Sequence, residues 1–435
     1  MMTPSGTGFR QALAIVAFLI AAVVPIKEVA FGLAIVLLLV FQPLNLQQVR
    51  MVLVQNWPIV VMIIVSLVMT LIDITDEMDS RSFIRIAFYY LRIPAFLLLG
   101  FGARRLLINE RALLWSIVIV GAWGAGQTVY RYAAAGNISG LDHYSVREII
   151  GTGDTTSILI PLCALILWRE TKLSILKVAL VAATIVTFLS IVAASSRTGI
   201  ELILVTAILS LPWVRPLVFA RWGGVVALIV TLLITTPLLL PILNLIGVDP
   251  LSINGLAEVI ARPRTDLQSI NLEWRGYETY MAFTAATKDG IIPLLFGHGM
   301  SAYAQLGVLI QLSPDELFDK ADVFHNGWSF IVFHSGILGI GMYIVQFYLF
   351  AKPPTTSGAV SLRSENRLFA LTVLSLAVST ATVAGIFNPG TFASGQLFLL
   401  GCFYPFSLVP VRVLNRLKSQ SLAVRNAGGS QPLHG

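Results

Sequence analysis

One histidine of this sequence lies where a base could act on a substrate. His325 belongs to the segment 322–328 (DVFHNGW), directly before a long apolar run. A histidine at a membrane boundary is neutral near physiological pH and can accept a proton from a hydroxyl group. The alternative is an interfacial histidine whose ring bonds to a backbone carbonyl, and the spacing alone favours that structural interpretation.

Three arginines outside the apolar runs could bind an anion. Arg197 lies in a short hairpin, 195–199 (SSRTG), between two apolar runs, and this holds its guanidinium near the membrane surface. Arg275 precedes Glu278 by three residues, so it either pairs with that acid along a helix or points into a cavity. For Arg264, the alternative is a solvated cation in a loop.

Two further arginines lie inside an apolar run. Arg85 and Arg92 are seven residues apart and so share one helical face, with Tyr89 between them. Arg85 could extend to the membrane surface, whereas Arg92 lies deeper, where an arginine normally faces an interior or a wet cavity. With Arg147 as another outer cation, these arginines predict a cationic cavity. Guanidinium groups bind phosphate oxygens bidentately, so a lipid-linked phosphate or pyrophosphate is the expected anion.

Several kinds of catalytic motif are absent from the sequence. It contains no P-loop, no helical His-Glu-x-x-His motif and no cluster of Cys and His with metal-ligand spacing. The two cysteines, Cys163 and Cys402, both lie in apolar runs and form no disulfide framework. We therefore expect no metal and no cofactor, and the driving energy must come from the substrate's own leaving group.

The composition indicates which elements position these residues. Of 435 residues, 56% are hydrophobic and 12% charged, and the mean hydropathy is +0.83. A soluble domain has about 25% charged residues. The composition excludes an ordinary cytosolic enzyme, a disordered chain and a nucleic-acid-binding module, and it predicts an all-α polytopic membrane protein. The first apolar stretch resembles a signal peptide but lacks a cleavage site of small residues, so we expect an uncleaved first span.

Twelve apolar runs are candidates for membrane-spanning helices. The first, second, sixth and eighth are short for a span of about 20 residues. If all twelve cross and the N-terminus is cytoplasmic, the inner connections carry 17 basic residues against three acids. This segregation follows the positive-inside rule and predicts two cytoplasmic termini. The runs are 11–24, 29–41, 57–72, 83–101, 113–130, 155–168, 174–194, 199–211, 218–243, 326–350, 368–387 and 391–411.

One long polar segment interrupts the apolar pattern. We expect membrane helices one to nine over 1–243, an outer loop or cap over 244–324, helices ten to twelve over 325–411, and a cytoplasmic tail over 412–435. Within the cap, the spacing of Trp274, Tyr277, Met281 and Ala285 predicts a helix over 271–288. The segment 313–316 (SPDE) predicts the start of another helix, and 296–300 (FGHGM) predicts a turn.

These pieces together resemble the bacterial O-antigen ligase family. The shared features are 196–199 (SRTG), Arg275 on the loop helix, 296–299 (FGHG), and the region from His325 to Gly339, with a large loop before a late span. O-antigen polymerases and protein O-oligosaccharyltransferases belong to the same superfamily and share variants of these motifs. The sequence departs from the more frequent Ser-Arg-Gly form at Thr198, which leaves the arginine in place.

The resemblance implies a GT-C-like glycosyltransferase in the bacterial inner membrane with its active site facing the periplasm. It implies transfer of O-antigen from undecaprenyl pyrophosphate to a sugar hydroxyl of lipid A–core, by inverting displacement without metal or ATP. His325 would then be the general base, and Arg197 and Arg275 would hold the pyrophosphate. Candidates for substrate binding are Arg85, Arg92, Arg147, Arg264 and His298.

Two alternatives stay open. The first is an O-antigen polymerase, whose acceptor is another lipid-linked repeat. The second is a transporter of an anionic lipid or solute, which would use the same arginines but gives His325 and the long loop no task. A purely structural membrane scaffold explains neither feature.

Overall fold

The computed structural model describes most of the apolar runs and part of the polar segment 244–324. The described residues are 4–24, 27–40, 46–72, 80–107, 110–135, 155–193, 197–235, 260–264, 270, 274–313, 316–350, 363–380, 385–387 and 391–403. The predicted tail, 412–435, lies outside them.

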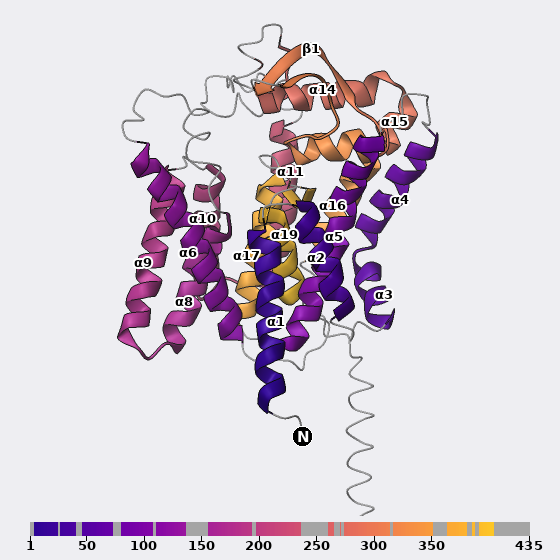
Figure 1. Cartoon of the computed structure of the whole chain (residues 1–435). Coiled ribbons are helices and arrows are strands. Elements are labelled where there is room, and N and C mark those ends of the chain that lie inside the picture. The colour runs from indigo at the N-terminus through magenta and orange to yellow at the C-terminus, as the bar shows by residue number, and fades with distance from the viewer. Residues whose placement is uncertain are drawn as a thin grey trace, which may run out of the picture.

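A bundle of helices forms the body of the molecule (Figure 1). Each of the twelve predicted apolar runs contains a described helix, whereas α3 has no counterpart among those runs. The elements of the bundle are α1 (Pro4–Val23), α2 (Lys27–Val40), α3 (Leu46–Gln55), α4 (Trp57–Ile72), α5 (Ser80–Leu106), α6 (Glu110–Ala134), η1 (Thr155–Leu159), α8 (Ile160–Glu170), α9 (Ser174–Ala193), α10 (Arg197–Ser210), α11 (Pro216–Thr235), α16 (Gly327–Phe350), α17 (Arg363–Val378), η3 (Gly385–Phe387) and α19 (Thr391–Phe403).

The outer faces of the bundle are apolar. Within the described ranges, five helices are long and apolar enough to cross a membrane: α5, α6, α9, α11 and α16. Large apolar side chains such as Ile119, Ile175 and Val192 are exposed on these helices, as expected where lipid replaces water. The chain is thus a mostly helical, multi-pass membrane protein. The count of twelve spans stays a prediction.

The centre of the bundle depends on close contact between α5 and α19. A Cβ at Gly100 would collide with the carbonyl oxygen of Phe398, and one at Gly401 would collide with that of Leu97. Small residues at such crossings let two helix backbones approach closely, which is how membrane helices gain packing energy without a hydrophobic driving force. The Cys402 thiol bonds to the Gly100 carbonyl at 3.2 Å at this crossing.

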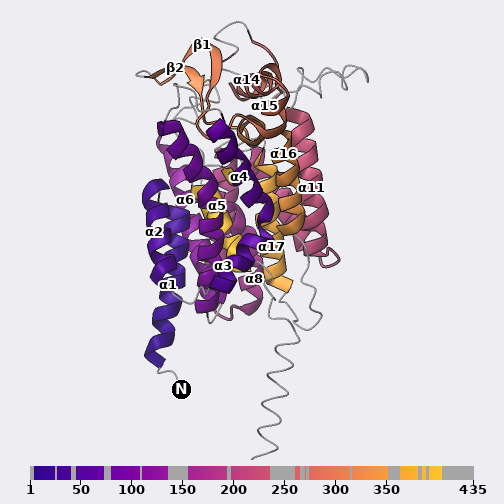
Figure 2. The ribbon, with the colours of Figure 1, turned by 90° about the vertical axis from the view of Figure 1, so that its right-hand side faces the viewer.

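A cap of two helices and a hairpin covers one end of the bundle (Figures 1 and 2). It consists of α14 (Trp274–Lys288), α15 (Ile291–Phe296), β1 (Ala304–Ser313) and β2 (Glu316–Ala321). The helix predicted over 271–288 is confirmed across its described part. The Tyr277 hydroxyl of α14 donates a hydrogen bond to the Leu306 carbonyl, which joins the helix to the hairpin.

The prediction that a second helix of the cap starts at 313–316 is wrong. Instead of starting a helix, Ser313 ends β1 and Glu316 begins β2, and the two strands pair antiparallel. The alternation along β1 explains the strand, since Ala304 and Leu306 are buried and Gln305 between them is exposed. The Ser-Pro-Asp-Glu pattern suits a helix start and a turn equally, and the cap is therefore not wholly helical.

A close backbone approach, made possible by a glycine on each side, joins the cap to α16. Gly336 interrupts α16 with φ of 65°, and Gly297 ends α15 with φ of 79°. A Cβ at Gly336 would collide with the backbone of Leu295, and one at Gly297 with the backbone of His334. The kink in α16 and the end of α15 thus fit together only without side chains.

We expect Gly336→Ala to destabilise the protein by at least about 1–3 kcal/mol, because it adds strain at a positive φ and a steric collision. Gly341→Ala in the same helix is the matched control, since a Cβ there meets nothing within 4 Å. At that position alanine should be neutral or stabilising by up to about 1 kcal/mol. Thermal unfolding of the purified protein in detergent measures both, and equal stability of the two variants would contradict a close backbone approach at Gly336.

Candidate functional site

One face of α14 places an acidic side chain against the bundle. Trp274, Glu278, Ala282 and Ala286 recur every four residues and are all buried. The predicted helix face includes Met281 and Ala285, but both are only partly buried. The buried positions are instead the next residues along the helix, Ala282 and Ala286. Four-residue spacing brings Glu278 beneath Trp274 on the same side of the helix.

The buried acid contacts His325 twice. The backbone N–H of His325 donates to Glu278 Oε2 at 3.0 Å, and its ring Nδ1 lies 3.3 Å from Glu278 Oε1. The Glu278 side chain is fully buried, whereas 58% of the His325 side chain is exposed. Both carboxylate oxygens thus have partners, and the far side of the imidazole faces outward. Glu278, considered in the sequence as a partner of Arg275, thus has His325 as a partner, and the contact is an ion pair when the ring is protonated.

Two groups compete for Nδ1 of His325, and the stronger contact indicates which ring nitrogen acts as a base. The indole Nε1 of Trp274 also approaches His325 Nδ1, at 3.4 Å. A hydrogen bond from Nδ1–H to the charged Glu278 carboxylate is stronger than one from the Trp274 indole N–H to a neutral Nδ1. We therefore assign the proton to Nδ1, where it bonds to Glu278. Nε2 then carries the lone pair on the exposed side of the ring and can accept a proton.

The charges around His325 oppose each other. The Glu278 carboxylate raises the pKa of His325 above its ordinary value, by charge attraction and by the hydrogen bond. The positive charge of Arg275 lowers that pKa. Arg275 follows Trp274 in α14, and the Trp274 indole lies 3.4 Å from the His325 ring. The side chain of Arg275 is partly buried at the start of α14. A base and a cation therefore share this end of the cap helix.

Polar contacts hold the segment that follows His325. Asn326 Oδ1 accepts from the backbone N–H of Trp328 at 2.9 Å, which caps the start of α16. The hydroxyl of Thr279 on α14 accepts from Asn326 Nδ2 at 3.1 Å and from the Ser329 hydroxyl at 2.9 Å. The sequence His-Asn-Gly-Trp thus places its asparagine between two helices and its histidine on the exposed side.

Contacts with α5 and α16 hold the segment before His325. Asp322 accepts from Arg85 Nη1 at 2.9 Å and from the Ser82 hydroxyl at 2.8 Å, both on α5. Its backbone oxygen lies 2.9 Å from Nε2 of His334, whose Nδ1 lies 2.6 Å from the Gly299 oxygen. Arg85 therefore helps to position the histidine segment, and its role in substrate binding stays a prediction.

His298 lies next to this region in the turn that follows α15. Its ring stacks on Phe333 of α16 with 4.9 Å between ring centroids, and its backbone N–H donates to the Phe333 oxygen at 2.7 Å. Its Nε2 is 3.6 Å from the Asp289 carboxylate. The ring is nearly buried, so its predicted role in orienting a sugar stays a prediction.

The remaining predicted arginines are not all brought to His325. Arg92 is 1% exposed inside the bundle, where its Nη2 donates to the Ile386 oxygen at 3.2 Å. Arg264 is partly buried and bonds to carbonyls of its own loop, at Arg262 and Pro263. Arg147 lies outside the described residues, and of Arg197 only the backbone, at the start of α10, is described. Their roles in binding stay predictions.

Sequence reasoning missed three residues of this site. In the sequence, Glu278 is considered only as a partner for Arg275, although its position four residues after Trp274 places it on the buried face. Asp322 and His334 carry no local signal, because their partners come from distant segments. Within the described ranges, no group of three His, Cys, Asp or Glu side chains could hold a metal ion.

The comparisons with known proteins leave this geometry without a reference. No protein-family model matches the chain, and no curated protein does so either.

We expect two substitutions to move the pKa of His325 in opposite directions. Glu278→Gln removes the negative charge that raises this pKa and should lower it, whereas Arg275→Gln removes a positive charge and should raise it. Nuclear magnetic resonance of the protein with labelled histidine rings measures the titration, and His325→Ala identifies the signal. Shifts of the same sign in both variants would contradict the proposed arrangement.

Proposed function

We propose that this chain is an O-antigen ligase that transfers O-antigen from undecaprenyl pyrophosphate to a sugar hydroxyl of lipid A–core. The observation that carries the proposal is the contact of His325 with buried Glu278, while 58% of the His325 side chain is exposed. Arg275 lies in the first turn of the same helix, α14. A base oriented by a carboxylate and placed beside a cation suits the attack of a hydroxyl on a phosphate-activated sugar.

The reaction is a single displacement. The acceptor hydroxyl oxygen forms a bond to the anomeric carbon of the donor sugar while the bond from that carbon to the pyrophosphate oxygen breaks. Nε2 of His325 takes the hydroxyl proton, and Glu278 stabilises the imidazolium through Nδ1. The electron pair of the broken bond leaves with undecaprenyl pyrophosphate. In this proposal Arg275 and Arg197 bind its phosphates, whose charge grows during the step.

The proposal includes the orientation of the chain. All twelve apolar runs cross the bacterial inner membrane in a GT-C-like arrangement, both termini are cytoplasmic, and the cap and His325 face the periplasm. The surplus of basic residues in the connections on the other side supports this orientation. The donor and the acceptor are both lipid-anchored, so a site at the periplasmic surface of the inner membrane would reach both.

We expect His325→Ala to lower transfer by about 10²–10⁴-fold, the usual cost of removing a general base. The assay uses purified protein with undecaprenyl-pyrophosphate O-antigen and lipid A–core, in chelator and without nucleotide, and follows the shift of the core on a gel. His434→Ala is the matched control among the histidines. Wild-type rates in a folded His325→Ala protein would end the proposal. Chain growth with the donor alone would assign a polymerase, and no product in either assay would favour a transporter.

We expect Glu278→Gln to move the acidic limb of kcat/KM to lower pH. A general base works unprotonated, so the raised pKa of His325 moves this limb toward higher pH in the wild type. Loss of the carboxylate charge reverses that shift and also lowers the maximal rate, because the imidazolium loses its stabilising partner. A pH profile that is lowered at all pH values without moving would argue against this role for Glu278.

A further inference from the structure

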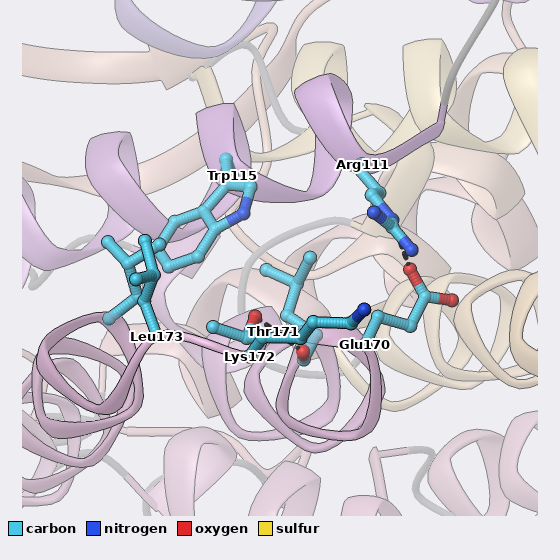
Figure 3. A pocket seen from close by; sticks show the side chains of 8 residues that line it. Arg111, Trp115, Glu170, Thr171, Lys172 and Leu173 are labelled. Atoms are coloured by element: carbon cyan, nitrogen blue, oxygen red, sulfur yellow. Dashed lines mark hydrogen bonds and ion pairs between the residues drawn. The ribbon is translucent and has the colours of Figure 1, made fainter.

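A second polar site lies at the end of the bundle opposite the cap. A groove of about 500 Å³ opens between the start of α6 and the connection from α8 to α9 (Figure 3). That connection lies at the lower end in Figure 1, whereas α14, α15 and β1 lie at the upper end. The groove is therefore separate from the site at His325 and has no task in the transfer proposed above.

The polar wall of the groove carries more positive than negative charge. Arg111 and Lys172 line it together with one acid, Glu170. Arg111 Nε donates to the Glu170 carboxylate at 2.6 Å, so that negative charge is already offset (Figure 3). Lys172 is exposed at the connection between α8 and α9. Lys177, over the ring of Trp168 at 5.1 Å, adds to the positive potential nearby.

The other wall is apolar and continues onto the surface that faces lipid. Trp115 and Leu176 line the groove, and Leu173 beside them is 62% exposed. Ile175 and Val178, at the start of α9, are exposed to 75% and 66%. Indole rings and basic side chains are typical of the layer where lipid headgroups lie. An occupant of this groove must therefore be anionic at one end and apolar at the other.

We propose that the groove binds the headgroup of an anionic phospholipid. The phosphate lies at Lys172, beside the ion pair of Arg111 and Glu170. The glycerol and the first acyl carbons lie against Trp115, Leu173 and Leu176. Basic pockets between membrane helices bind anionic headgroups by this combination of charge and apolar contact. A soluble anion would use only the first part of the site.

Native mass spectrometry of the full-length protein in detergent tests the proposal. The probes are phosphatidylglycerol and phosphatidylcholine with identical acyl chains. We expect the wild type to retain phosphatidylglycerol preferentially, and Lys172→Gln to weaken that binding about five-fold, as expected for one cation near an anionic headgroup. Arg215→Gln makes the same change of charge at an exposed position in the connection from α10 to α11 and should leave the binding unchanged.

Four outcomes would overturn the proposal. Equal retention of both lipids by the wild type would show that the headgroup charge is not recognised. An unchanged affinity in Lys172→Gln, or an equal loss in Arg215→Gln, would move the binding elsewhere. Displacement of phosphatidylglycerol by millimolar inorganic phosphate would identify a simple phosphate site instead of a lipid site. Activity is not measured, so a failure here leaves the proposed transfer reaction untouched.

Discussion

A fully buried carboxylate constrains how the cap lies on the helix bundle. An ionised carboxylate closed to solvent costs several kcal/mol unless hydrogen bonds and an opposite charge compensate it. Glu278 finds that compensation in the backbone N–H and the ring of His325, so the cap helix and the chain before α16 stabilise each other. The same contact orients the imidazole and leaves its other nitrogen exposed. One interaction therefore serves both packing and chemistry.

Three further connections between the cap and the bundle support the contact of Glu278 with His325. Thr279 joins α14 to the start of α16, Asp322 joins the histidine segment to Arg85 on α5, and the close approach at Gly336 joins α15 to α16. A catalytic base is useful only when its support is rigid, because small displacements from the reactive geometry lower rates strongly. The cap is thus a continuation of the bundle in the described part of the chain, and His325 lies where the two meet.

The arginines show how one residue type takes different roles in one chain. The sequence groups Arg85, Arg92, Arg264 and Arg275 as lining of one cationic cavity. The structure gives Arg85 an acidic partner, Arg92 a backbone carbonyl inside the bundle, and Arg264 carbonyls of its own loop. Arg275 belongs to the first turn of α14, next to Trp274, which contacts His325, and its positive charge lowers the pKa of His325. A cation in an apolar helix needs a partner, and the sequence does not identify that partner.

Local properties of the sequence were enough to predict much of this molecule. Hydropathy and charge over single segments predict the membrane class and a helix in each of the twelve runs, and helical spacing predicts α14. Local patterns failed at Ser313, where one motif suits both a turn and a helix start. They also failed at Glu278, because its partner His325 is 47 residues away. Hydropathy and periodicity describe neighbours along the chain, whereas a buried acid is satisfied by whatever packing brings beside it, and only the tertiary structure decides that.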